Sequence, residues 1–244
     1  MSNIGKQIPI LAVDTSNDIC SVAVVFDKNK YILNNLFIKN IHSEKLFEII
    51  ESSLKLLNMG IKDVKSLVYS NGPGSFTGLR IGMSALKGIT TGLNVNLYVL
   101  NTYDVMAYEL SYKLPIDNII CIVNQADNEE YYYASYRILG QGKFEVITQT
   151  TTIKKLEFKL EDNVLYFGKI KDKLPIYNHY FSPNANYLGF YLIDNFENCG
   201  PADLANVEPF YLKGFKGLGK KRWFMLILSE PIINFINMNK GNLC

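Results

Sequence analysis

The sequence predicts an α/β protein with two lobes, the second smaller than the first. A β-rich opening up to residue 38 is followed by helical and strand patterns that alternate to residue 113. A glycine-rich turn joins an apolar strand to an apolar helix at residues 67–82, and a second series of β-rich runs begins after Leu114-Pro115. The boundaries we expect are 1–113 for the first lobe, 114–206 for the reduced lobe, and 207–244 for a return segment and tail that pack back on the first lobe.

Composition limits the class of protein. The 244 residues are 48% hydrophobic, enough for a substantial core. The formal net charge of +2 is nearly balanced, so composition alone does not imply a strong electrostatic attraction to nucleic acid. The four cysteines contain no C-x-x-C pair, so we expect neither a disulfide framework nor a zinc knuckle. We expect the protein to lie in the reducing environment of the cytoplasm. The longest apolar run, residues 223–228, is far shorter than the roughly twenty residues of a membrane span, so no membrane partner is expected.

The first lobe is expected to open with a three-stranded meander. Residues 8–13 form an apolar strand that ends at the polar turn Asp14-Thr15-Ser16, and β-rich runs follow at 20–26 and 31–38. Asp14 has two possible roles at this strand end. Its carboxylate can hold the water shell of a magnesium ion, or it can cap the turn as an Asx motif.

A helix is expected after the meander. Ser43 is a natural N-cap with Glu44 in the first turn, and a helical apolar pattern then runs to Met59 and stops at Gly60. The further elements expected in this lobe are strands at 67–70 and 97–100 and helices at 79–93 and 102–113.

The glycine-rich turn lies between the strand at 67–70 and the next helix. Gly72 and Gly74 can adopt positive φ around Pro73, and Ser75 or Thr77 can cap the helix. Backbone amides at such a helix start can cradle a phosphate, or the turn can be a compact strand-to-helix corner. No Lys-Ser/Thr pair follows as in a Walker loop, which favours the corner. The residues of interest at this end of the sheet, as structural turn or possible nucleotide contact, are Asp14, Gly72, Gly74, Ser75, Thr77 and Gly78.

The second lobe is predicted to be mainly β. Strands are expected at 118–123, 131–139, 144–150, 164–167 and 176–181, a helix at 184–196, and a return toward the first lobe at 208–212. The loop at residues 124–130 contains no glycine, and its three acidic side chains would repel a triphosphate.

The turn sequence resembles a family signature. Ser-Asn-Gly-Pro-Gly-Ser-Phe-Thr-Gly-Leu-Arg-Ile-Gly at residues 70–82 looks like that of the bacterial TsaB (YeaZ) family, and the resemblance extends to residues 11–16, 42–44 and 208–213. The β-β-β-α-β-α-β-α order resembles the ribonuclease H-like half of the actin, Hsp70 and sugar-kinase superfamily, which implies an actin-like ATPase (ASKHA) fold. The chain departs from the family pattern Asp-Ala-Arg-x-x-Glu-Val-Tyr by placing Gln125 at the aspartate and Asp127 at the arginine.

The resemblance implies a role in tRNA modification. TsaB-like chains are non-catalytic paralogues of TsaD. This chain would therefore pair with TsaD and, with TsaE and ATP, support N6-threonylcarbamoylation of adenosine 37 in tRNAs that read codons beginning with A. It would form a homodimer when alone and reach tRNA through the complex. It would hold no cofactor tightly and meet ATP or ADP only in the assembled complex.

Two enzymatic alternatives stay open. An active ATPase or phosphotransferase of the same fold would need a second glycine-rich phosphate turn, which the loop at 124–130 does not supply. A TsaD-like metallo-glycoprotease would need a His-x-x-x-His pair after the strand at 97–100, whereas the two histidines of the chain are His42 and His179. We therefore expect no catalytic residue and no metal site.

A partner face is predicted on the first two helices. The apolar positions of the first helix span about half its circumference, more than a sheet alone should cover. The second helix adds small residues on a narrow face, which would let a partner helix approach closely or would let this helix pack closely on its own sheet. The residues expected at this face are Leu46, Ile49, Leu56, Ile81, Ala85 and Gly88.

The tail after residue 213 is basic and then apolar. Lys220, Lys221 and Arg222 precede the apolar run at 223–228. Such a tail can lie on a membrane surface, contact RNA, or pack on the protein itself, and we favour the last.

Overall fold

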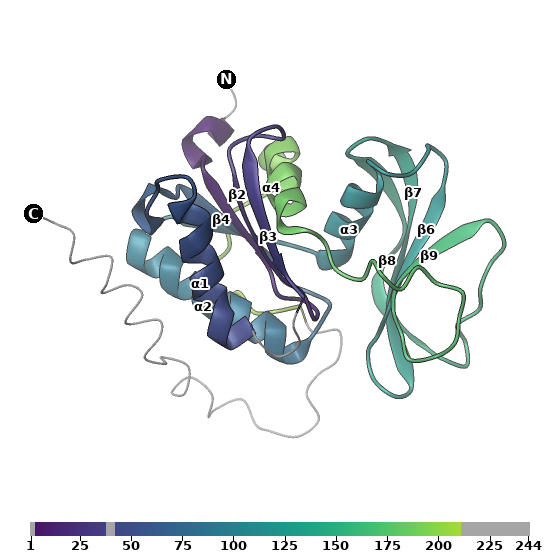
Figure 1. Cartoon of the computed structure of the whole chain (residues 1–244). Helices are drawn as coiled ribbons and strands as arrows, with labels where there is room; N and C mark the ends of the chain where they lie inside the picture. Colours follow the sequence, from purple (N-terminus) through teal and green to yellow (C-terminus); the bar gives the residue numbers. More distant parts are fainter. Residues whose placement is uncertain (1–2, 38–41, 211–244) are drawn as a thin grey trace, which may run out of the picture.

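The first lobe is built on a five-stranded sheet (Figure 1). The computed structural model describes residues 3–37 and 42–210. The strands are β1 (Ile10–Asp14), β2 (Cys20–Val25), β3 (Tyr31–Leu36), β4 (Ser66–Ser70) and β5 (Asn96–Leu100), in the order β3-β2-β1-β4-β5. β1, β2 and β3 are antiparallel neighbours, which confirms the predicted meander, and β4 and β5 run parallel to β1.

Helices cover both faces of this sheet. α1 (His42–Lys55) and α2 (Phe76–Leu93) pack on one face, and α4 (Ala185–Asp194) packs on the other with part of α3 (Thr102–Leu110). Because helices cover both faces, β1 and β2 are buried at every position and are apolar without strict alternation, apart from Asp14 and Ser21. α1 already includes Ser43, so the prediction of Ser43 as the N-cap is wrong, by a margin usual for helix ends.

The second lobe is a four-stranded sheet. Its strands are β6 (Ile119–Gln125), β7 (Glu130–Gly140), β8 (Lys143–Lys154) and β9 (Val164–Lys169), in the order β8-β7-β6-β9. The strand expected at 176–181 is wrong, because Tyr177 makes a single bridge to Phe167 and the chain then turns away. Pro175, which has no N–H to donate, comes shortly before this bridge.

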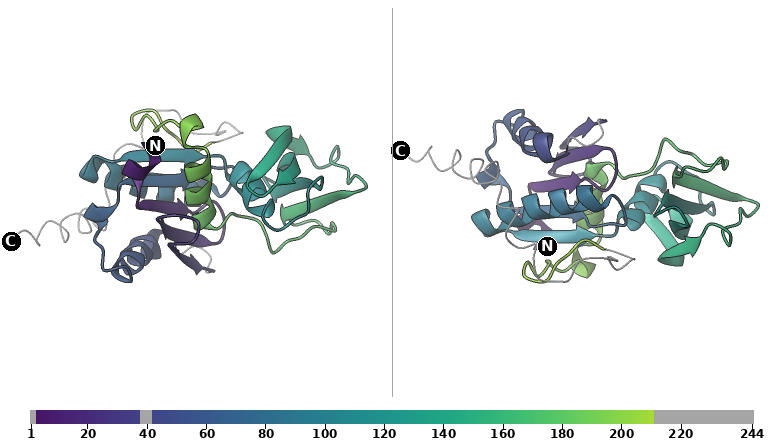
Figure 2. Two further views of the ribbon diagram at one scale, coloured as in Figure 1. Left: turned by 90° about the horizontal axis from the view of Figure 1, so that it is seen from above. Right: turned by 90° about the horizontal axis from the view of Figure 1, so that it is seen from below.

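α3 connects the two lobes, which lie side by side in both views of Figure 2. Val105 and Tyr108 of α3 pack with α4 and the first sheet. Met106 and Ala107 pack on the second sheet. A helix that packs on both sides is buried nearly all round, and α3 is buried at every position except Asp104.

The chain returns to the first lobe earlier than expected. α4 lies inside the range assigned to the second lobe, 114–206, yet it packs on β1 and β2. The Ala185 amide donates to Ser21 Oγ at 2.8 Å, and a Cβ at Gly189 would come within 2.7 Å of the Val25 side chain. The boundary at 206 is therefore wrong for α4. Helical periodicity shows that a helix has an apolar face but does not show which sheet that face covers.

The return segment then runs along the β5 side of the first sheet. The Ala202 amide donates to the Leu97 carbonyl oxygen at 2.7 Å. At the end of the described chain, the Phe210 amide donates to the Asn71 carbonyl oxygen, also at 2.7 Å. The expected return is thus confirmed as far as Phe210, and the tail predicted to pack back on the first lobe lies outside the described residues.

Candidate functional site

Two polar turns meet at one end of the first sheet. β1 and β4 are parallel neighbours, so the turn at residues 14–18 that follows β1 lies beside the glycine-rich turn at 71–75 that follows β4. This is the place where the sequence predicts either a phosphate cradle or a structural corner. The contacts between the two turns distinguish these alternatives.

The glycine-rich turn packs directly against the first turn. A Cβ on Gly74 would lie 2.2 Å from the Ser16 carbonyl oxygen, and a Cβ on Gly78 would lie 2.1 Å from the Thr15 carbonyl oxygen. Gly72 has the expected positive φ, +118°, but Gly74 does not, so the expectation for Gly74 is wrong. Gly74 is required by the close approach of two backbones, which depends on tertiary packing.

The start of α2 is capped from within the turn. Ser75 Oγ accepts the Gly78 amide at 3.2 Å, which confirms Ser75 as the N-cap, while Thr77, two residues further on, is exposed. The Ser75 amide donates to the Ser16 carbonyl oxygen at 2.6 Å. Carbonyl oxygens of the first turn thus face the helix start where a phosphate would need amides and positive charge. The geometry supports a structural corner.

Asp14 is buried at the centre of this arrangement, with 0% of its surface exposed. Its carboxylate accepts hydrogen bonds from the Ser70 hydroxyl, from the Ser16 hydroxyl at 3.2 Å and from the Ser16 amide at 3.3 Å. Burial raises the pKa of Asp14 to about 7, against the lowering effect of these hydrogen bonds. The bond to the Ser16 amide is the Asx contact that the sequence predicts as one role of Asp14.

Thr15 joins the same network to α2. Its hydroxyl donates to the Gly78 carbonyl oxygen at 2.7 Å and lies 2.9 Å from the Tyr69 hydroxyl. The Tyr69 hydroxyl in turn donates to the Leu79 carbonyl oxygen at 3.0 Å. All of these atoms are buried, so the two turns and the first turn of α2 form one packed polar unit.

The first turn also contacts the second lobe. Lys169, the last residue of β9, forms an ion pair with Asp18, and Asn17 Nδ2 donates to the Phe181 carbonyl oxygen at 2.7 Å. Sequence reasoning did not identify Lys169 or Phe181, because they lie more than 150 residues from their partners and belong to no motif. Both contacts hold residues 17 and 18 against the second lobe.

The loop that departs from the family pattern forms a tight hairpin. Asp127 Oδ1 accepts the amides of Glu129 at 2.8 Å and Glu130 at 2.9 Å, and the Ala126 amide donates to the Glu130 carbonyl oxygen at 3.1 Å. Asp127, which stands at the family's arginine position, therefore closes the turn between β6 and β7. An arginine has no acceptor and could not make these two bonds.

Two of the residues predicted for a partner face lie in the core. Leu46 and Ala85 are buried between the helices and the sheet, so their assignment to an exposed face is wrong. Ile49, Ile81 and Gly88 are half-buried, and Leu56 is 70% exposed. On both α1 and α2, the centre of the apolar face packs on the sheet, and only the margins of that face reach the surface.

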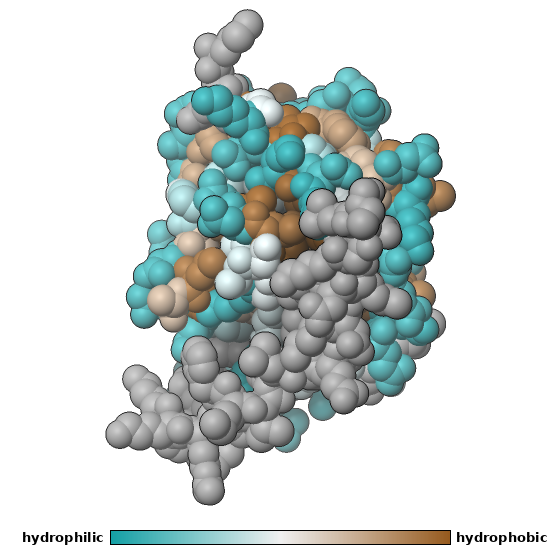
Figure 3. All heavy atoms as spheres, turned by 90° about the vertical axis from the view of Figure 1, so that its left-hand side faces the viewer, coloured by the Kyte–Doolittle hydropathy of each residue, from teal (hydrophilic) through white to brown (hydrophobic). Residues whose placement is uncertain are grey.

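The exposed margin of α1 points away from α2. Ser53 Oγ accepts Asn34 Nδ2 of the edge strand β3 at 2.7 Å, which turns the flank with Ile49, Ser53 and Leu56 toward β3. α2 instead covers β4 and β5, on the far side of β1. The flank of α1 with Ile49, Ser53 and Leu56 and the small residues of α2 therefore belong to two separate surfaces. Figure 3 looks at the molecule from the left of Figure 1, where both helices lie, and shows apolar atoms between hydrophilic ones.

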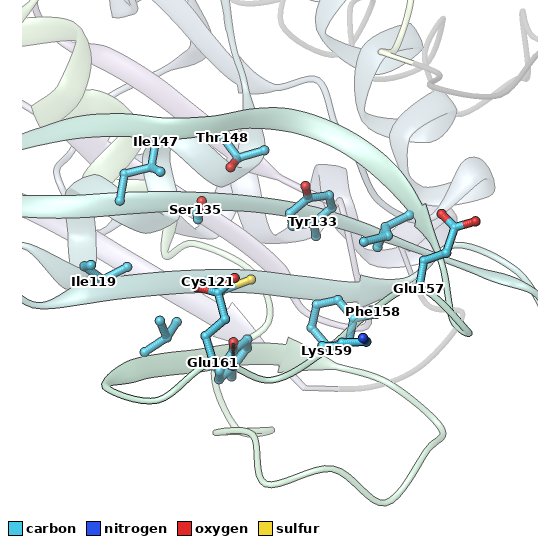
Figure 4. Close-up of a pocket in the computed structure, with 13 residues that line it drawn as sticks. Ile119, Cys121, Tyr133, Ser135, Ile147, Thr148, Glu157, Phe158, Lys159 and Glu161 are labelled. Carbon is cyan, nitrogen blue, oxygen red and sulfur yellow. Dashed lines mark hydrogen bonds between the residues drawn. The ribbon is translucent and has the colours of Figure 1, made fainter.

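A separate cavity of about 410 Å³ lies on the second sheet, on the face away from α3 (Figure 4). Cys121 of β6 and Tyr133 of β7 line it from the sheet, and Phe158 and Glu161 line it from the segment that follows β8. None of the residues predicted for a site lies in this cavity.

Within residues 3–37 and 42–210, no group of three or more His, Cys, Asp or Glu side chains could hold a metal ion. No helix in the same ranges is long and apolar enough to cross a membrane. His179 is exposed, and nothing is described of the His42 side chain.

The sequence and the fold of this chain are similar to those of known proteins. A family model described as TsaD, tRNA N6-adenosine threonylcarbamoyltransferase, matches residues 37–166. The tRNA threonylcarbamoyladenosine biosynthesis protein TsaB of Haemophilus influenzae is 28% identical over 127 residues, which are 52% of this chain and 53% of that protein. The protein of the same description from Buchnera aphidicola subsp. Schizaphis graminum is 30% identical over 155 residues, 62% of this chain and 72% of that protein.

The match with the Haemophilus influenzae protein thus spans about half of that relative's length. Among solved structures, YeaZ from Pseudomonas aeruginosa superposes with a TM-score of 0.70 at 19% identity, covering 83% of this chain and 99% of that one. At this identity the likeness concerns the fold. It confirms the predicted actin-like α/β fold.

Proposed function

Because this chain belongs to the TsaB (YeaZ) family within the wider TsaD family, we propose that it acts in the biosynthesis of threonylcarbamoyladenosine in tRNA as a non-catalytic subunit. In this proposal it pairs with a TsaD-like paralogue that carries out the transfer, together with a TsaE-like ATPase and ATP. It reaches tRNA through that complex, and it forms a homodimer when the paralogue is absent.

One observation carries the non-catalytic part of the proposal. The Thr15 and Ser16 carbonyl oxygens lie within 2.1 and 2.2 Å of the Cβ positions of Gly78 and Gly74, so protein backbone occupies the space between the two turns. The carboxylate of Asp14 is enclosed by Ser16 and Ser70. An ATPase or phosphotransferase of this fold would need that space for phosphate and that carboxylate for a metal's water shell.

The partner surface we propose is the outward side of α2. Gly88 and Ser84 are half-buried there, one turn apart, and both are small enough for a helix of the paralogue to approach closely. A glutamate at Gly88 would bring a charge into that contact without a counter-charge. The desolvation cost of such a charge is several kcal/mol, and about 3 kcal/mol weakens binding roughly 100-fold.

The test is Gly88→Glu, with Gly200→Glu as matched control. Glutamate is a better helix former than glycine, so the melting temperature of Gly88→Glu should not fall. Gly200 is exposed and has no heavy atom within 4 Å of its Cβ position. We expect Gly88→Glu to weaken co-sedimentation with the TsaD-like paralogue by about 100-fold, and Gly200→Glu to have no effect. Normal assembly of the folded Gly88→Glu protein would place the partner elsewhere.

A further inference from the structure

The two edges of the five-stranded sheet differ. β5 forms one edge, and the return segment covers it through the hydrogen bond from Ala202 to Leu97. β3 forms the other edge, and no described strand pairs with its outer side. An uncovered edge strand presents a row of N–H and C=O groups to which an extended segment can add.

The β3 edge has apolar side chains beside it. Phe37, directly after β3, is 71% exposed, and Leu56, directly after α1, is 70% exposed. Half-buried Ile49 lies between them on the flank of α1 that faces β3. Asn34 of β3 contacts Ser53 of α1. Phe37 lies three strand residues from Asn34, and Leu56 lies three helical residues from Ser53 in the opposite direction, so the two side chains are about 15 Å apart along the edge, close to the length of five strand residues.

Helices cover both faces of β3. Asn34 Nδ2 of β3 donates a hydrogen bond to Ser53 Oγ of α1, and Asn35 Nδ2 of β3 donates one to Asn184 Oδ1 at the start of α4 at 2.6 Å. On the α4 side, the rings of Tyr31 and Phe190 pack edge to face at 5.2 Å. A strand added beyond β3 would therefore meet apolar groups on both faces, and such strands have continuous apolar sequences.

The described chain ends close to this edge. Phe210 is bonded to Asn71, one residue past β4, and Phe37 is one residue past β3. β3 and β4 run in the same direction, with β2 and β1 between them, so these two ends lie three strand spacings apart, about 14 Å. The twelve residues 211–222 can span roughly 40 Å.

The sequence beyond Phe210 contains one segment with the required character. Residues 223–228 are Trp-Phe-Met-Leu-Ile-Leu, six apolar residues without alternation, as many as β3 contains. Lys220, Lys221 and Arg222 precede them. Near the Phe37 end, the first turns of α1 carry the exposed side chains of Glu44 and Glu48, of which Glu48 forms an ion pair with Lys45 at 2.7 Å.

We propose that residues 223–228 add to the outer edge of β3 as a sixth strand of the first sheet, antiparallel to β3, and cover Phe37, Ile49 and Leu56. The basic residues before the segment then lie near Glu44 at the start of α1. The occupied edge is separate from the outward side of α2, so the proposed partner surface stays free. This inference does not depend on the proposed function.

Trp223 is the single tryptophan of the chain and reports on the proposal directly. In the full-length protein we expect acrylamide to quench its fluorescence several-fold less efficiently than that of free N-acetyltryptophanamide, independently of protein concentration. Leu56→Glu should remove this protection, because a charge would have to be buried under the added strand. Leu156→Glu is the matched control, since Leu156 is 96% exposed on the second lobe, and it should change nothing.

Three results would overturn the proposal. The first is that acrylamide quenches Trp223 of the unaltered protein as efficiently as it quenches N-acetyltryptophanamide. The second is that the protection of Trp223 survives in a folded Leu56→Glu variant. The third is that the protection vanishes on dilution, which would indicate a second copy of the chain as the occupant. If Leu56→Glu does not fold by circular dichroism, Phe37→Asp takes its place, because Phe37 lies outside the helices and strands. Hydrogen exchange gives an independent reading, since the outward amides of β3 should be protected in the full-length chain and exposed in the variant.

Discussion

Gly78→Ala is expected to lower the free energy of unfolding by about 3 kcal/mol or more. The added Cβ would lie 2.1 Å from the Thr15 carbonyl oxygen, a distance that real Cβ atoms do not reach. The neighbouring atom is backbone, held by β1 and by the hydrogen bond between Thr15 and Gly78, so it cannot move aside cheaply. The cost therefore arises from separating the two turns, and it exceeds the gain of up to about 1 kcal/mol in helix propensity.

Urea unfolding with Gly92→Ala as the control measures this effect. Gly92 is an exposed residue of the same helix, and alanine there should be neutral or slightly stabilising. A loss of less than about 1 kcal/mol for Gly78→Ala would mean that the two turns are not packed as described.

Asp14→Asn is expected to change how stability depends on pH. Asp14 has a pKa of about 7 in the folded protein, raised by burial, against 3.8 for an ordinary aspartate. Between these values the folded protein holds a proton that the unfolded chain has released. Stability is therefore greatest below about pH 4 and falls by about 1.4 kcal/mol per pH unit as the pH rises to 7, after which it changes no further through this group.

The comparison of unfolding free energies isolates this effect. Between about pH 4.5 and pH 8, the unaltered protein should lose about 3 kcal/mol more than Asp14→Asn, which has no carboxyl to titrate at this position. Asparagine keeps the shape of the side chain and an oxygen for the Ser16 amide. Parallel pH profiles for the two proteins would show that Asp14 titrates at an ordinary pKa and is not buried as described.

The sequence predicts much of the first lobe because its signals are local. The meander, the alternation of strands and helices, and the cap at Ser75 follow from runs of a few residues. The glycine-rich turn is also recognisable from its residues. The reason for Gly74 is not, because it depends on the position of Ser16, which is 58 residues earlier and comes near only after β1 and β4 have paired.

What could not be predicted depends on pairings across the fold. A helical wheel shows that α1 has a wide apolar face, but it does not show that Leu46 is in the core and that the flank with Leu56 points toward β3. The ion pair between Asp18 and Lys169 has no signature in sequence. The location of α4 on the first sheet depends on a long return that periodicity does not reveal.

The most direct test of the central claim, that this chain is a non-catalytic subunit, is threonylcarbamoyl transfer to tRNA by a reconstituted complex that contains Asp14→Asn. Asp14 is the residue at which the sequence predicts a possible magnesium site, and in the structure it is buried and enclosed by Ser16 and Ser70. With assembly confirmed by sedimentation, we expect transfer within about threefold of the unaltered complex. A loss of about 100-fold or more in a fully assembled complex, the scale of a lost catalytic group, would contradict the claim.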